Sequence, residues 1–318
     1  MKRFIWFAVV GLVIAACGQK SVFSVFPQLH YQDHDLVTTL QEEDVHNIFI
    51  DLIMFNSCNS VTHEGKLYFV HPFNRDGKHV AKVFSVDEKF NVQEILKIPS
   101  GKGPGEAMAI KYLFFKDNDL YLWDPTLCRF LIYDNEFQFI DTYNLEKNIL
   151  LTAFYTYKGE IFALSGQGEI FNIYRVEFSK NIKLNLVKSV KIKTPSENKQ
   201  VSELRKRVSV FQEKDDSLIL KAFNLVLFFD KEELEFSKEA GLGFHSAENN
   251  GVVEPNLIWI NNKGDILFSY RYSEGYLLRS NGNQAKKIDH KDIAKVLKIC
   301  GSDFIIVKND DFFRVFRK

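Results

Sequence analysis

Apolar and polar residues alternate in short runs along most of the chain, which is the pattern of half-buried β-strands. Between residues 112 and 143 four such runs follow one another, and turn-forming residues at 116–119, 124–126 and 134–136 separate them. Connections this short join antiparallel neighbours, so the stretch predicts a four-stranded meander. One meander cannot bury both of its faces, and it needs other sheets packed against it.

The rest of the chain supplies further strands of the same kind. An apolar triplet after a polar turn recurs six times, starting at Leu67, Leu120, Ile161, Leu218, Ile266 and Phe304. The starts lie 53, 41, 57, 48 and 38 residues apart. Repeats of roughly 40–50 residues with four strands each are typical of β-propellers. The pattern therefore predicts an all-β fold, a six-bladed β-propeller of four-stranded antiparallel blades. A large β-sandwich or two smaller all-β domains remain the alternative.

The last repeat is short of a strand. After the triplet at Phe304 only one more strand-like run, 312–316, precedes the end of the sequence. The alternating segment at 35–55 can supply the missing strand. We therefore expect an N-terminal strand to close the ring, because closure removes an exposed sheet edge. The predicted propeller domain spans 35–318.

One blade entry carries a specific motif. Residues 101–106 read Gly-Lys-Gly-Pro-Gly-Glu, and the strand-like runs Leu-Tyr-Leu-Trp-Asp (120–124) and Phe-Leu-Ile-Tyr-Asp (130–134) follow. This combination resembles the six-bladed, TolB-like (NHL-like) β-propeller lipoproteins of Bacteroidetes-type bacteria. The specific part covers about ten residues, and a weaker blade pattern covers 56–318. The resemblance implies a propeller fold and a lipoprotein's location in the cell envelope far more than it implies an activity.

The N-terminal sequence also indicates a lipoprotein. A basic start, Met1-Lys2-Arg3, precedes an apolar run over 4–16 and the sequence Ile-Ala-Ala-Cys17. The run is shorter than the roughly 20 residues that a membrane-spanning helix needs, and it fits a secretory signal. We interpret residues 1–17 as a lipoprotein signal peptide with Cys17 as the lipidated residue, and 18–34 as a tether. Gly18 after Cys17 favours the outer membrane, with the domain facing the periplasm. An ordinary signal peptide is the alternative.

The charge balance bears on the class of partner, and the cysteines bear on metal binding and disulfides. Lys and Arg number 41 and so do Asp and Glu, so no strong basic field is present and nucleic acid is not expected as a partner. Thirty Phe and twelve Tyr suit packing between blades. Cys58, Cys128 and Cys300 have no metal-binding spacing. We expect buried thiols, with one disulfide possible in an oxidising compartment and its pairing undetermined.

The glycine-rich motif is the candidate ligand site. Gly101, Gly103 and Gly105 allow backbone to approach a ligand closely, and Lys102 and Glu106 add charge. The loop joins an outer strand to the next inner strand, on a ring face where propellers commonly bind. Glu254 precedes a first strand in the same way as Glu106, so it joins this candidate set. The alternative is that the loop only turns the chain and that Glu106 caps backbone N–H groups.

No catalytic or metal-binding motif accompanies this loop. A Gly-x-Ser-x-Gly elbow and a His-Glu-x-x-His motif are both absent, and no catalytic residue is assigned. His30 and His34 fall in the expected tether, and His63, His71 and His79 are eight residues apart, too far for one strand to present together. No cofactor is expected.

Two functions remain open. The first is a non-catalytic, lipid-anchored module that binds or scaffolds an envelope protein, peptide or glycan. The second is a metal-dependent hydrolase or lyase with Ca²⁺ in the central channel, held partly by Glu106 and Glu254. Ca²⁺ needs six to eight oxygen ligands, and the sequence does not identify the others.

Overall fold

The structure is a computed structural model, and it describes residues 32, 36–41, 60–72, 77–146, 149–167, 170–179, 181–192, 208–213, 216–222, 225–242, 245–246, 252–253, 255–260, 263–270, 274–278, 286–288, 293–299, 302–308 and 312–318. The expected signal peptide, nearly all of the tether, and Cys17, Cys58, Cys300 and Glu254 lie outside these residues. All regular elements among the described residues are strands. None of the described residues forms a helix that is long and apolar enough to cross a membrane.

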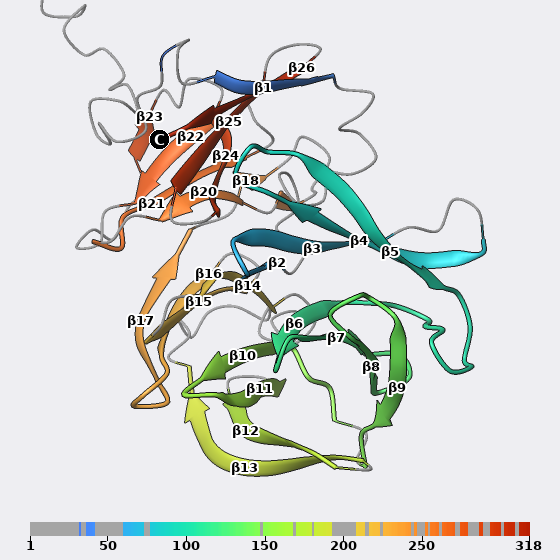
Figure 1. The fold of residues 1–318 in the computed structure, drawn as a ribbon. Helices are drawn as coiled ribbons and strands as arrows, with labels where there is room; N and C mark the ends of the chain where they lie inside the picture. Colours follow the sequence, from blue (N-terminus) through green and yellow to red (C-terminus); the bar gives the residue numbers. More distant parts are fainter. Residues whose placement is uncertain are drawn as a thin grey trace, which may run out of the picture.

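Among the described residues, five sheets each consist of four consecutive antiparallel strands. Figure 1 shows how these sheets are arranged. The first contains β2 (Ser60–His63), β3 (Lys66–Pro72), β4 (His79–Val86) and β5 (Val92–Pro99). The second contains β6 (Tyr112–Lys116), β7 (Asp119–Asp124), β8 (Arg129–Tyr133) and β9 (Phe139–Asn144). The third contains β10 (Ala153–Tyr157), β11 (Glu160–Gln167), β12 (Ile170–Phe178) and β13 (Ile182–Lys191). The fourth contains β14 (Val208–Glu213), β15 (Ser217–Ala222), β16 (Leu225–Asp230) and β17 (Glu235–Gly241). The fifth contains β20 (Asn256–Ile260), β21 (Ile266–Tyr270), β22 (Glu274–Leu278) and β23 (Lys286–Ile288).

The remaining strands form two other sheets. One has the order β1-β26-β25-β24 and combines the N-terminal strand with the end of the chain. Its strands are β1 (Leu36–Gln41), β24 (Ile293–Ile299), β25 (Ser302–Lys308) and β26 (Phe312–Arg317). A small two-stranded sheet consists of β18 (His245–Ser246) and β19 (Val252–Val253).

The all-β class and the four-stranded antiparallel blades in a propeller arrangement are confirmed. The number of blades differs from the prediction, because five blades, not six, consist of four consecutive strands. The N-terminal strand β1 pairs antiparallel with β26, the last strand of the chain, in a separate sheet. The sequence could not give this pairing directly, because the two strands lie at opposite ends of the chain.

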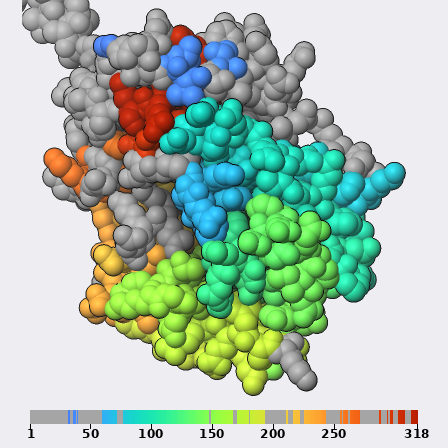
Figure 2. Space-filling view, viewed as in Figure 1, coloured from blue at the N-terminus to red at the C-terminus, as the bar shows by residue number. Residues whose placement is uncertain are grey.

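Apolar side chains fill the spaces between neighbouring sheets. Tyr68 and Val83 of the first sheet pack with Leu122 and Leu131 of the second. The two sheets lie against each other on the face drawn in Figure 2. A larger cluster joins the second, third and fourth sheets, and Trp123, fully buried, lies in it with its ring centroid 4.8 Å from that of Phe130. The high Phe and Tyr content thus stabilises contacts between blades, as the composition predicted.

The turns between the third and fourth strands of the first two blades share one design. Asp87 Oδ1 accepts hydrogen bonds from the backbone N–H groups of Lys89 and Asn91, both at 2.9 Å. Asp134 does the same after β8, accepting from Glu136 at 2.9 Å and Gln138 at 2.8 Å. Each turn then holds an aromatic residue in the left-handed region, Phe90 at φ 62° and Phe137 at φ 61°.

Five outer strands carry a one-residue β-bulge. In β9, Ile132 and Tyr133 of β8 pair with Asp141 and Phe139, so Ile140 is the extra residue. In β13, Ile173 and Tyr174 of β12 pair with Lys188 and Leu186, so Val187 is the extra residue. The register places the other three bulges at Val37 in β1, Ile95 in β5 and Ser237 in β17. Bulges at edges discourage pairing with another chain, because they twist the strand and interrupt its ladder.

Candidate functional site

The glycine-rich loop connects β5 to β6 and is fixed at its base by backbone hydrogen bonds. The Gly101 N–H donates to the Ala107 carbonyl at 3.0 Å, and the Ala107 N–H donates to the Pro99 carbonyl at 2.9 Å. Ser100 and Ala107 also form an isolated parallel bridge. The two ends of the loop are therefore held together, and the six residues of the motif form a closed turn.

Glu106 folds back into its own loop. Its Oε2 accepts a hydrogen bond from the Gly103 N–H at 2.7 Å, and the Glu106 N–H donates to the Gly103 carbonyl at 3.3 Å. A Cβ on Gly101 would lie 2.0 Å from Glu106 Oε2, and one on Gly103 would lie 3.0 Å from it. The two glycines thus make room for the carboxylate. The alternative in which Glu106 caps a backbone N–H group is confirmed, whereas ligand binding by this loop stays a prediction.

Arg129, at the start of β8, stabilises the loop through its guanidinium group. Its Nη1 donates to the Lys102 carbonyl at 3.0 Å, and its Nη2 donates to the carbonyls of Gly103 at 3.0 Å and Glu106 at 2.8 Å. The side chain is 8% exposed. A planar guanidinium can reach several carbonyls at once, and hydrogen bonds from a charged donor are stronger than neutral ones. The loop is therefore a rigid surface feature.

The outer strands of the second blade complete the support. The Tyr133 hydroxyl donates to the Gly105 carbonyl at 3.4 Å, and burial raises the pKa of Tyr133 to about 12. The Phe139 ring lies 3.4 Å from the position that a Cβ on Gly105 would take. Gly105 has φ 71°, a conformation that glycine adopts without steric cost. The described contacts of the loop are thus with β8 and β9, the third and fourth strands of the blade.

Asp124 organises the neighbouring turn between β7 and β8. Its buried carboxylate accepts hydrogen bonds from the backbone N–H groups of Met108 at 2.8 Å, Thr126 at 2.9 Å and Leu127 at 3.1 Å. One carboxylate therefore ties the glycine loop segment to the turn that precedes Arg129. Asp124 thus acts as a turn residue, whereas Trp123 before it lies in the core.

The loop presents uncharged and cationic groups to solvent. The side chains of Lys102 and Pro104 are exposed, and Met108 is 42% exposed. The acidic and guanidinium groups of the region are instead engaged within the protein. An ammonium, a proline ring and a thioether on a rigid turn suit contact with another molecule better than acid–base chemistry.

Lys111 precedes the inner strand β6 and is a further residue of interest. Its Nζ lies 5.5 Å from the centroid of the Tyr112 ring, a cation–π contact. Burial lowers the pKa of Lys111, and it raises the pKa of Tyr112 beyond its ordinary range. No sequence pattern predicted the burial of Lys111, because burial of a lysine just before a strand depends on what packs around it.

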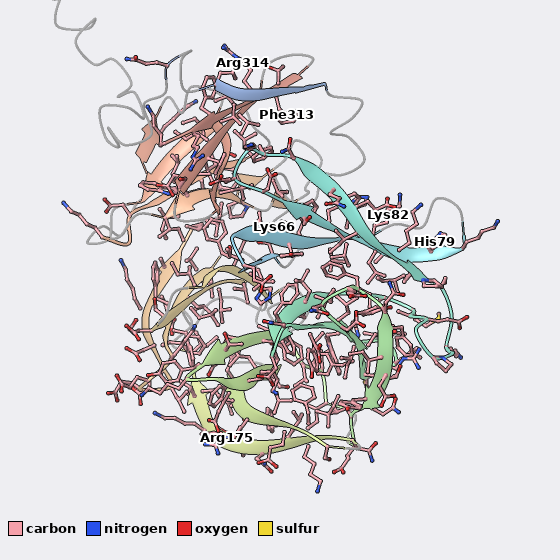
Figure 3. The ribbon with its side chains drawn as sticks, viewed as in Figure 1. Lys66, His79, Lys82, Arg175, Phe313 and Arg314 are labelled. Atoms are coloured by element: carbon pink, nitrogen blue, oxygen red, sulfur yellow. The ribbon has the colours of Figure 1, made fainter. Side chains whose placement is uncertain are left out.

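The metal candidates do not come together in the described part of the chain. Within it no group of three or more His, Cys, Asp or Glu residues could hold a metal ion. The His63 ring instead stacks on Phe115 with centroids 4.0 Å apart. His79 lies at the start of β4 (Figure 3). The Cys128 Sγ lies 3.6 Å from the Pro125 carbonyl oxygen; burial, and secondarily the Asp124 charge, raise the pKa of this thiol.

The predicted site residues thus have two outcomes. Gly101, Lys102, Gly103, Gly105 and Glu106 lie in one turn, and Glu254 lies outside the described residues. Sequence reasoning did not identify Arg129 as the side chain that holds this turn, and it did not predict that Asp124, expected in a turn, also binds the Met108 N–H beside the loop. A usable signal existed in part, because Asp124 precedes Pro125 and such residues often organise turns through their side chains.

Comparisons with known proteins give a distant likeness. No protein-family model matches the chain, and no curated protein does. A streptogramin B lyase structure aligns with a TM-score of 0.41 at 10% identity over 83% of this chain and 94% of its own. Virginiamycin B lyase from Staphylococcus aureus aligns with a TM-score of 0.41 at 9% identity over 82% of this chain and 95% of its own. A catalytically inactive form of that lyase with quinupristin gives 0.39 at 10% identity, over 83% and 96%. Such scores carry no argument about activity or substrate.

Proposed function

We propose that this chain is a lipid-anchored β-propeller of the cell envelope that binds a protein, peptide or glycan without catalysing a reaction. The anchor is Cys17, and the protein belongs to the outer membrane with its propeller in the periplasm. The binding face carries the Gly101–Glu106 turn. The observation that carries the proposal is that Arg129 holds this turn through three carbonyls while Lys102 remains exposed.

Preorganisation is the physical reason for a binding role. A loop that is already ordered loses little conformational entropy when a partner binds. Hydrogen bonds engage the Glu106 and Arg129 side chains with the turn, and the Asp124 carboxylate with Met108 beside it, so these groups hold the shape of the surface. The alternative with Ca²⁺ in the channel gave Glu106 and Glu254 as partial ligands; the Glu106 Oε2 accepts the Gly103 N–H within the turn.

We further propose that the sheet of β1, β26, β25 and β24, built from both ends of the chain, acts as a sixth blade and closes the ring. Phe90, in the β4–β5 turn, packs against Phe304 of β25 with ring centroids 5.6 Å apart. Phe137, in the equivalent turn of the next blade, lies 6.2 Å from Tyr68 of β3. Phe304 and Tyr68 are each the third residue of the second strand of their sheets. The same relationship thus links the first sheet to the sheet of β1 and the second sheet to the first.

Two experiments test the proposal separately. Metabolic labelling with a fatty acid, followed by fractionation, should place the label and the parent protein in the membrane fraction. Cys17→Ser should lose the label. A Cys17→Ser protein that still carries the label would refute the anchor.

Binding is tested by crosslinking in envelope preparations. Lys102→Ser combined with Met108→Ser should abolish a crosslinked species that the parent forms. Lys89→Ser, in the exposed turn after Asp87, is the matched control and should leave that species unchanged. Equal crosslinking by the parent and the loop variant would contradict binding at this turn.

A further inference from the structure

Lys111 is a half-buried cation without a counter-ion in the described part of the chain. Its Nζ lies 5.5 Å from the centroid of the Tyr112 ring, and it forms neither an ion pair nor a side-chain hydrogen bond with the described residues. Burial lowers the pKa of this amine. Taking an ammonium out of water costs free energy unless an anion or hydrogen-bond acceptors compensate. The folded chain thus leaves this charge for another molecule to neutralise.

Two other lysines that are buried or half-buried have such partners. Lys231 is 2% exposed, and its Nζ donates to the Thr156 carbonyl at 3.0 Å. The half-buried Lys82 forms an ion pair with Glu94 at 2.8 Å. Burial of these two lysines therefore serves contacts within the fold, whereas burial of Lys111 does not.

Lys111 lies at the end of the inner strands that also carries the glycine-rich turn. It directly precedes β6, the first strand of the second blade, and its N–H donates to the Trp123 carbonyl at 3.0 Å. β6 lies beside β2 and β10, the first strands of the neighbouring blades (Figure 1). The Gly101–Glu106 turn and Lys111 belong to the same connection into β6. Lys111 is therefore part of the face on which we propose that the partner binds.

Cations outnumber carboxylates around this connection. The segments 100–112 and 124–129 contain the cations Lys102, Lys111 and Arg129 and the carboxylates Glu106 and Asp124. Both carboxylates accept hydrogen bonds from backbone N–H groups, and neither forms an ion pair with a lysine of the described residues. A ligand that brings its own anionic group fits this balance better than a neutral or cationic ligand.

We propose that Lys111 binds an anionic group, a carboxylate or a phosphate, of the ligand that this face recognises. The proposal rests on the proposed binding function and names the chemistry of its ligand. An anion beside the ammonium would offset the cost of burying the charge. The backbone hydrogen bond to Trp123 fixes the position from which the side chain reaches the ligand.

Reductive methylation of the full chain, followed by peptide mass spectrometry, measures the reactivity of each lysine. Formaldehyde and a hydride donor methylate the neutral amine, so an anion that keeps Lys111 charged and covered slows the reaction. Inorganic phosphate or acetate, compared with chloride at equal ionic strength, should slow methylation of Lys111 about threefold and leave the exposed Lys89 unchanged. Protection by acetate would indicate a carboxylate, and protection by phosphate alone would indicate a phosphate. Equal rates in all three salts, or equal slowing at Lys89, would overturn the proposal.

A stability measurement separates a ligand contact from a structural role. Lys111→Met removes the unpaired charge and keeps a long side chain, so it should raise the urea midpoint of the free protein. Lys116→Met, at the other end of β6, is the matched control and should not raise the midpoint, because Lys116 is paired with Asp117. A lower midpoint in Lys111→Met would mean that the lysine stabilises the fold through Tyr112, and it would overturn the proposal.

Failure of the anion contact is distinguishable from failure of the binding function, because the probe anions need no envelope partner. A crosslinked species that the Lys102/Met108 variant loses, without anion protection at Lys111, would refute the anion contact and leave the binding function standing. Anion protection without any crosslinked species would refute the binding function and leave the anion contact standing.

Discussion

Arg129 and Glu106 are joined by a hydrogen bond of 2.8 Å from the guanidinium Nη2 to the Glu106 carbonyl oxygen. The carboxylate of the same glutamate turns the other way and accepts from Gly103. Glu106 therefore belongs to the turn through both its backbone and its side chain. This relationship explains why a basic residue in β8 and a glycine-rich motif more than twenty positions earlier form one structural unit.

Replacing Arg129 should destabilise the Gly101–Glu106 turn. Arg129→Lys keeps the charge, but an ammonium cannot match the fork that reaches three carbonyls. We expect the free energy of unfolding to fall by about 3 kcal/mol, since hydrogen bonds to charged donors contribute about 1.5–3 kcal/mol each. Urea denaturation measures the change. Arg175→Lys, at an exposed ion pair on β12, is the control and should cost less than about 1 kcal/mol. Equal stability of the parent and Arg129→Lys would contradict the role of the guanidinium.

Gly101 should tolerate a methyl group only when the Glu106 carboxylate is removed. Gly101→Ala places its Cβ against Glu106 Oε2, and overpacking of this kind costs about 1–3 kcal/mol. In the Glu106→Ala background the same substitution should cost at least about 1 kcal/mol less. A double-mutant cycle by chemical denaturation measures this coupling. Gly241→Ala, where a Cβ meets nothing within 4 Å, is the control. Additive effects would show that the crowding is relieved elsewhere.

Phe90 should be essential for the contact between the first sheet and the sheet that contains β1. The side chain is buried and contacts Phe304, so Phe90→Ala should lower the free energy of unfolding by about 3–5 kcal/mol. It should also speed hydrogen exchange in β25. Phe139→Ala, a partly exposed aromatic on β9, is the control and should leave exchange in β25 unchanged. Unaltered exchange in Phe90→Ala would argue against closure of the ring at this contact.

Glu94 should contribute stability that is lost in acid. Burial acts to raise its pKa, but hydrogen bonds and attraction from Lys82 at 2.8 Å and Lys97 at 3.2 Å lower the pKa below its ordinary value. A depressed folded-state pKa gives stability that is present above the unfolded value of about 4.3 and is lost as pH falls through the folded value.

The test compares the parent with Glu94→Gln. At pH 7 the variant should be less stable by about 0.2–1 kcal/mol, because the pair is partly exposed and water screens it. The difference should shrink as pH falls below about 4.3, and thermal melts across that range measure it. A difference that is constant with pH would mean that the carboxylate charge is not responsible. Glu136→Gln, at an exposed glutamate in the turn between β8 and β9, makes the same change in net charge and is the control.

Most of the strands and turns could be predicted from the sequence. The alternation over 112–143 predicted four strands, and β6 to β9 occupy that stretch. The polar residues at 116–119 and 134–136 predicted turns, and Asp134 supplies the side chain that closes one of them. These features depend on neighbours in the chain, so local chemistry specifies them.

The β-bulges could not be predicted from the sequence pattern. Ile95 interrupts β5 and thereby places Glu94 and Lys97, three residues apart, beside Lys82 on one face. Strict alternation would have put Glu94 and Lys97 on opposite faces. A bulge depends on the register of the partner strand, which strand patterns alone do not contain.

By itself the sequence determined the all-β class, the order of short antiparallel strands and the glycine turn, because these follow from alternation, turn chemistry and the freedom of glycine. Only the tertiary structure decided that β1 pairs with β26, that Arg129 holds the Gly101–Glu106 turn, and that Lys111 lies half-buried beside the Tyr112 ring. The physical reason is distance along the chain. Contacts between residues that are far apart in sequence form only when blades pack, and packing depends on all side chains at once.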